Sequence, residues 1–124
     1  MTLKPSEIPV TVEPEVDTSK EEVLRILRGA YRLLSRPNGW TKRFLKFGDS
    51  FCLIGALTYA DNGNARYIPK NDNTPVGTAQ DLIAREIGRT RGSLGLANWN
   101  DRIARTQRDV LSVLEGAIRK AEKL

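Results

Sequence analysis

The chain has 124 residues, which is room for one domain, and no stretch approaches the roughly 20 consecutive apolar residues that a membrane helix needs. It contains no histidine and one cysteine, which excludes histidine-activated nucleophiles, His/Cys zinc sites and an internal disulfide. We therefore expect a cytoplasmic protein without a metal or cofactor, and we favour a non-enzymatic role.

The net charge of +5 is distributed unevenly along the chain. One lysine against four carboxylates gives residues 1–18 a charge of −3, and 19 cations against 11 carboxylates give residues 19–124 a charge of +8. These charges, with three prolines near the start, predict an extended acidic arm over residues 1–18 and a single basic helical domain over residues 19–124. A basic body favours an anionic partner, either nucleic acid or an acidic protein face.

The first predicted helix carries apolar residues at helical spacing. Ser19 and Glu22 form a capping box at its start, and the helix is expected to end near Ser35, before a Pro-Asn-Gly sequence. Four arginines recur along it at spacings of three and four residues, which places them within about 80° of one another on one side of the helix. This arginine stripe consists of Arg25, Arg28, Arg32 and Arg36.

The middle of the chain is predicted to contain a short strand followed by a buried helix. Residues 40–47 are expected to form the strand, and residues 50–60 the helix, started by Asp49 or Ser50. A hairpin across Gly48 and Asp49 is the alternative, which a Gly-Ala pair in the second half of the segment disfavours.

A long polar loop is predicted over residues 61–77, with a short strand at residues 66–68. Thr78 is expected to cap a third helix that ends near Arg91 and Gly92.

The last part of the chain is predicted as a second loop followed by a fourth helix. The loop covers residues 93–100, and the helix runs from Gln107 to Glu122 with Thr106 as its cap and one broad apolar face. The fold class is therefore mainly α, with about four helices in one domain, a short strand or hairpin and an extended N-terminal arm. An α+β fold is the alternative.

The arginine stripe and the cations that follow it are the main candidate for a binding surface. No acidic residue occurs between Arg25 and Lys46, unlike an ordinary solvated helix face, which is the competing interpretation. Arginines at this spacing suit phosphates or acidic side chains. The candidate partner-binding residues are Arg25, Arg28, Arg32, Arg36, Lys42 and Arg43.

A second candidate is a small-ligand pocket lined by Trp40, Cys52, Trp99, Asn100 and Asp101. A structural role is the favoured alternative, because Asn and Asp side chains bond nearby backbone groups and fix turns, while a tryptophan fills the core. Apolar neighbours make Cys52 a packing residue rather than a reactive thiol.

The same residues carry a resemblance to a known family. Gly39-Trp40, the Cys52-x-x-Gly55-Ala56-Leu57 block, and Trp99-Asn100-Asp101 followed by Arg105-Thr106 resemble an uncharacterised family of small bacterial and phage proteins, over most of the chain from about residue 22. The resemblance implies a helical α+β fold and a frequent occurrence in phages, prophages and bacterial genomes. It implies no established activity.

The leading hypothesis is a non-enzymatic binding protein, in the manner of a phage or mobile-element regulator or inhibitor that acts on a host protein through its basic surface. Nucleic-acid binding and small-ligand binding are the alternatives. No membrane partner is expected, and apolar helix faces on so short a chain make a homodimer plausible. For the leading hypothesis we expect salt-sensitive binding that an Arg28/Arg32 double charge reversal weakens.

Overall fold

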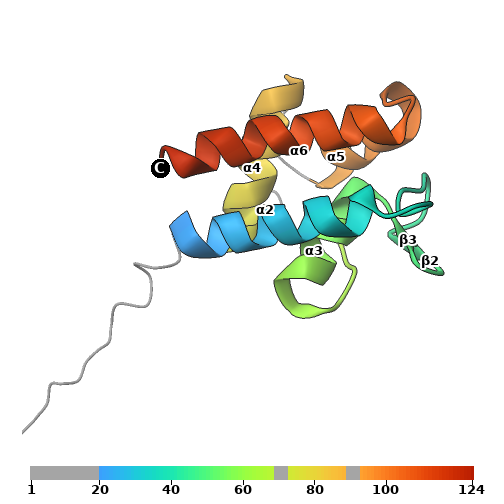
Figure 1. Cartoon of the computed structure of the whole chain (residues 1–124), viewed down its shortest axis with the longest axis horizontal. Helices are drawn as coiled ribbons and strands as arrows, with labels where there is room; N and C mark the ends of the chain where they lie inside the picture. Colours follow the sequence, from blue (N-terminus) through green and yellow to red (C-terminus); the bar gives the residue numbers. More distant parts are fainter. Residues whose placement is uncertain (1–19, 69–72, 89–92) are drawn as a thin grey trace, which may run out of the picture.

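The computed structural model describes residues 20–68, 73–88 and 93–124. It is mainly helical with one short antiparallel hairpin (Figure 1), which confirms the predicted class. In chain order the elements are α2 (Lys20–Ser35), β2 (Lys46–Phe47), β3 (Ser50–Phe51), α3 (Leu53–Asn62), α4 (Pro75–Ile87), α5 (Ser93–Asn98), the π-helix η2 (Trp99–Ile103) and α6 (Gln107–Glu122). The predicted arm and Ser19 of the predicted capping box lie outside the described residues.

The two long helices form the centre of the molecule. α2 and α6 lie side by side and antiparallel, so the start of α2 is next to the end of α6 (Figure 1). α2 also packs against α3 and α4. The apolar faces of α2 and α6 are fully buried, and they contribute Val23, Ile26, Leu27, Ala30, Leu34, Val110, Leu114, Ala117 and Ala121 to the core. None of the helices in the described ranges is both long and apolar enough to cross a membrane.

The predicted bounds of α6 are confirmed, because its start signal is local. The Thr106 side chain accepts a hydrogen bond from the backbone N–H of Asp109 at 3.2 Å, and the Asp109 carboxylate accepts one from the backbone N–H of Thr106 at 3.0 Å. This reciprocal capping box satisfies backbone donors that a helix start otherwise leaves unpaired.

The hairpin and the helix that were alternatives for the middle of the chain are both present. β2 pairs with β3 across Gly48 and Asp49, and α3 begins only at Leu53. A helix start at Asp49 or Ser50 is therefore wrong: the cap is Cys52, whose Sγ accepts from the backbone N–H of Gly55 at 3.3 Å. A strand over residues 40–47 is too long, since β2 covers Lys46–Phe47 alone.

α4 begins and ends earlier than the sequence suggests. Its cap is Thr74, whose hydroxyl accepts from the backbone N–H of Gly77 at 3.3 Å. Pro75 takes the first helical position, where a backbone N–H would have no acceptor within the helix, so proline's missing N–H costs no hydrogen bond there. Thr78 therefore lies inside the helix. Gly88, in a left-handed conformation with φ of 68°, ends it. Residues 66–68 are not a strand.

The predicted loop over residues 93–100 is also wrong. These residues form α5 and the first part of η2, in which the backbone N–H of Ala104 donates to the carbonyl of Trp99 at 2.9 Å. Trp99 and Asn100 are buried. Packing and distant hydrogen bonds stabilise a helical turn that the local sequence, rich in Gly and Asn, does not favour.

Candidate functional site

The arginine stripe is partly used for internal contacts, beginning with Arg25. Its guanidinium donates to Glu22 at 2.8–3.1 Å and to the carbonyl oxygens of Ala60 and Asp61 at 2.8 and 3.3 Å. These carbonyls belong to the last turn of α3, whose partial negative charge favours a cation. The hydrogen bond with Glu22 raises the pKa of Arg25 and lowers the pKa of Glu22. Arg25 therefore connects α2 to α3.

The other three arginines of the stripe differ in their contacts. Arg28 forms an ion pair with Glu122 at 3.0 Å, which connects α2 to α6. Arg36 donates to the carbonyl oxygens of Leu33 at 3.3 Å and Asp49 at 3.2 Å. The guanidinium of Arg32 has no hydrogen bond or ion pair with the part of the chain that the structure describes. The stripe therefore does not present four equivalent free cations.

Six of the cations that form no ion pair within the described ranges lie at one end of the molecule, whereas Arg32, Arg119 and Lys123, which also form none there, lie elsewhere. The end of α2, the β2–β3 hairpin and the start of α6 lie together at that end (Figure 1), and the Gln107 side chain connects them by donating to the carbonyls of Leu34 and Arg36. Arg43 and Arg102 border one small hollow beside Asp101. We call this region the basic aromatic end; it consists of Arg36, Lys42, Arg43, Lys46, Arg102 and Arg105 together with Phe44 and Phe47.

Within the described ranges, no carboxylate forms an ion pair with any of the six cations of the basic aromatic end. Lys42 lies over the ring of Trp40 at 5.6 Å, and Lys46 lies over Phe51 at 5.5 Å while donating to the carbonyl of Gly48. These contacts orient the two ammonium groups and leave their charge uncompensated.

Phe44 and Phe47 are exposed within this surface. Their side chains are 51% and 64% accessible, and their rings stack with centroids 5.2 Å apart. Sequence reasoning treated them as part of a strand and did not single them out. The sequence signal that could have identified them is the cation directly before each ring, Arg43 before Phe44 and Lys46 before Phe47. Charged residues are seldom buried, so such neighbours are unusual for core positions.

The predicted pocket residues contact one another around Asn100, which is fully buried. Its Oδ1 accepts from the indole N–H of Trp40 at 2.7 Å and from the backbone N–H of Leu53 at 3.1 Å, and its Nδ2 donates to the carbonyl of Thr41 at 3.1 Å. These partners are far away in the sequence, whereas the prediction placed them nearby. Asn100 thereby fastens η2 to the start of α3 and to the Trp40 segment.

Asp101 extends this network to the basic aromatic end. Its Oδ1 accepts from the side chain of Asn100 at 2.9 Å and from the backbone N–H of Arg43 at 2.8 Å. Arg43 has a positive φ of 76°, which a non-glycine residue adopts only when the surroundings hold it. Asp101 therefore fixes the backbone from which the Arg43 side chain extends.

Cys52 and Trp99, the remaining predicted pocket residues, are buried packing groups. Burial raises the pKa of the Cys52 thiol, and its Sγ serves as the cap of α3. Such a thiol has little thiolate character at neutral pH. No three Cys, Asp or Glu side chains in the described ranges are placed to hold a metal ion.

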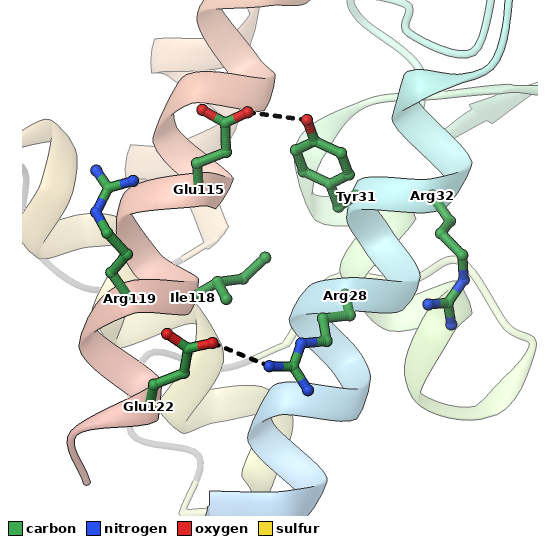
Figure 2. Close-up of a pocket in the computed structure, with 7 residues that line it drawn as sticks. All are labelled: Arg28, Tyr31, Arg32, Glu115, Ile118, Arg119 and Glu122. Atoms are coloured by element: carbon green, nitrogen blue, oxygen red, sulfur yellow. Dashed lines mark hydrogen bonds and ion pairs between the residues drawn. The ribbon is translucent and has the colours of Figure 1, made fainter.

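A shallow groove of about 380 Å³ lies between α2 and α6 (Figure 2). Tyr31 donates to Glu115 at 2.8 Å, and Glu115 also pairs with Arg108 at 2.7 Å. The second carboxylate of the groove, Glu122, pairs with Arg28. Both carboxylates are thus paired with this chain's own groups, and no sequence pattern predicted the groove. Its lining is Arg28, Tyr31, Arg32, Glu115, Ile118, Arg119 and Glu122.

Comparison with known proteins gives one match. A family model described as a family of unknown function (DUF6197) matches residues 18–120, which includes α2 and nearly all of α6. No curated protein and no solved structure matches the chain. The match confirms the resemblance to an uncharacterised family, and it leaves most of the acidic N-terminal stretch outside the matched residues.

Proposed function

We propose that this chain, which belongs to the DUF6197 family of unknown function, is a non-enzymatic binding protein that docks onto an acidic protein surface through its basic aromatic end. The observation that carries the proposal is the grouping of six cations whose side chains form no ion pair, within the described ranges, around two exposed phenylalanines. Aromatic and arginine side chains are enriched in protein interfaces.

The proposal moves the docking surface away from the first half of the arginine stripe. Arg25 and Arg28 already pair with Glu22 and Glu122, so a partner would have to break these pairs to use them. Arg36, Lys42 and Arg43 need no such exchange. Reversal of Arg28, as in the Arg28/Arg32 double charge reversal suggested by the sequence, would also place a carboxylate beside Glu122. A loss of binding in that variant would not distinguish a loss of stability from the loss of a docking residue.

A protein partner is favoured over nucleic acid by the arrangement of the surface. The two phenylalanine rings stack on each other, which takes up one face of each ring that a base would otherwise use. Recognition of a single strand usually combines several separate stacking platforms with a continuous basic groove. A regulator or inhibitor of another protein would suit a compact docking end of this kind.

The test is a double charge removal, Arg43→Gln with Arg102→Gln, because both side chains lie at the surface beside the same hollow, where glutamates would face Asp101. The probe is poly-L-glutamate as a defined acidic polypeptide, titrated at low and moderate salt. We expect the wild-type chain to bind in a salt-sensitive way and the double variant to bind at least about tenfold more weakly.

The matched control is Arg119→Gln with Lys123→Gln, which makes the same change in net charge near the opposite end of α6 (Figure 1). We expect it to weaken binding by less than about threefold, apart from the general effect of net charge. Equal losses in both double variants would overturn the proposal. Tighter binding of a single-stranded oligothymidylate than of poly-L-glutamate, at the same salt, would replace it with nucleic-acid binding.

A further inference from the structure

The exposed pair Phe44 and Phe47 is the least expected feature of the surface. The chain contains three phenylalanines; Phe51 is in the core, while these two are more than half accessible. Large apolar side chains that are adjacent and rimmed by charged groups are typical of a binding patch. Their mutual stacking covers one face of each ring and leaves the rest in water.

The segment that carries the pair is held rigidly. The carbonyl of Leu45 accepts from the backbone N–H of Cys52 at 3.3 Å, and it lies so close to α3 that a Cβ on Gly55 would be 1.8 Å from that oxygen. Asp101 holds the backbone N–H of Arg43 at 2.8 Å. A side chain presented from a fixed backbone loses less conformational entropy when it is buried by a partner.

The charge around the rings decides between possible occupants. Arg43 and Lys46 flank them in the sequence, and Arg102 shares a hollow with Arg43. A second copy of the chain, docked by the same face, would bring mostly like charges together, because the six cations outnumber the neighbouring carboxylates Asp49 and Asp101. An acidic partner with an apolar pocket would bury the two rings and would pair its carboxylates with the cations.

We infer that Phe44 and Phe47 are the apolar anchor of the docking surface, inserted by the hairpin into a hydrophobic pocket that acidic side chains surround on the partner. This inference rests on the proposed function and specifies the partner's chemistry. The anchor contributes affinity because the ring surface is buried by the partner. The cations orient the two proteins and increase their association rate.

The experiment pans a random-peptide display library against the full chain and measures the enriched peptides by titration. We expect the enriched sequences to combine Asp or Glu with Leu, Ile, Met or Trp. The double variant Phe44→Ser with Phe47→Ser should bind them at least about thirtyfold more weakly, as expected for the loss of anchor residues. The control Leu124→Ser, which removes a comparably exposed apolar side chain at the far end of α6, should stay within about threefold of wild type.

The outcomes separate the anchor from the proposed function. Acidic peptides that bind the double-serine variant as tightly as the wild type would overturn the anchor and leave the charge-based proposal standing. Enriched peptides without acidic residues, unaffected by Arg43→Gln with Arg102→Gln, would overturn both. Failure to enrich any peptide that contains apolar and acidic residues together would also overturn the anchor. Circular dichroism of each variant excludes unfolding as the cause of lost binding.

Discussion

Asn100 shows at the scale of one residue how a polar side chain can organise a small core. It is fully buried, and its single amide contacts three residues in two segments: the indole of Trp40, the backbone of Thr41 and the first residue of α3, Leu53. Buried polar groups of this kind are stabilising only while every partner is satisfied. The same network reaches Arg43 through Asp101, so it also supports the proposed docking surface.

Replacement of Asn100 by alanine is expected to destabilise the protein by about 2–4 kcal/mol, because the indole N–H of Trp40 and the backbone N–H of Leu53 would both be left buried without an acceptor. Urea denaturation measures this change. The control is Asn98→Ala at the preceding turn, where no side-chain cap hydrogen bond exists, with an expected loss below about 1 kcal/mol. Equal losses in the two variants would contradict a special role for Asn100.

At the scale of elements, the contact between α3 and the segment before β2 depends on a missing side chain. Gly55 lies in the first turn of α3, directly beneath the backbone of Leu45. Gly116 also lies within a helix, α6, but the nearest atom to its added Cβ would be the carboxylate of Glu86. A flexible side chain can move away and a pinned backbone cannot, so the two glycines should respond differently to the same substitution.

Gly55→Ala is expected to destabilise the protein by about 3 kcal/mol or more, since overlap with the Leu45 carbonyl exceeds the gain of about 1 kcal/mol in helix propensity. Gly116→Ala has the same propensity gain and should change stability by less than about 1 kcal/mol in either direction. Thermal and urea unfolding of the two variants provide the comparison. A tolerated Gly55→Ala would show that the Phe-bearing segment is not pinned to α3.

The capping box of α6 predicts a pH dependence. The backbone N–H groups of Arg105 and Thr106 donate to Asp109 and lower its pKa below the usual 3.8. A carboxyl group with a lowered pKa in the folded state stabilises it above the unfolded pKa, and this stabilisation is lost as the pH falls through the folded value. The hydrogen bond from Arg108 lowers the pKa of Glu115 in the same direction.

We therefore expect the stability of the wild-type chain to fall as the pH drops below about 4, and Asp109→Asn to show a flatter dependence over that range. Proton NMR titration should place the midpoint of Asp109 below that of the same residue in a short unfolded peptide. A midpoint at or above the peptide value would show that the capping box does not form in solution.

At the scale of the whole molecule, the ion pairs between helices and the exposed phenylalanine pair lie in different regions. Ion pairs connect the helices where they pack, Arg28 to Glu122 between α2 and α6 and Lys120 to Glu86 between α6 and α4. The cations of the basic aromatic end have no such partners within the described ranges, and the exposed rings are there too. The packed helices therefore form the body of the molecule, and the hairpin end carries the surface that we propose for binding.

This division predicts that the phenylalanines differ in their effect on stability. Phe44→Ser with Phe47→Ser should change the unfolding free energy by less than about 1 kcal/mol, because both side chains are largely in water already. Phe51→Ala should cost about 3–5 kcal/mol, because that ring is in the core and packs at a tilt against Tyr59, with the ring centroids 4.9 Å apart. Denaturant unfolding measures both. A large loss in the double-serine variant would mean that the exposed pair is structural.

The sequence by itself determined the helical class and the bounds of α2 and α6. Their signals are local: apolar residues at helical spacing, a Thr106–Asp109 capping box, and a Pro-Asn-Gly sequence after Ser35. The same local rules misplaced α4, where Thr74 with Pro75 was a better start signal than Thr78, and left the hairpin and helix alternatives unresolved around Ser50.

Only the tertiary structure decided which polar and apolar groups remain available at the surface. Arg28 is paired because Glu122, at the other end of the chain, lies beside it, and Asn100 has its roles because distant backbone groups meet it. Periodicity identifies the side of a helix on which a residue lies, but it does not reveal what packs there. Partners far apart along the chain are brought together by the packing of the whole core, and for that reason the pairing of Arg28 and the stacking of Phe44 on Phe47 could be found only in three dimensions.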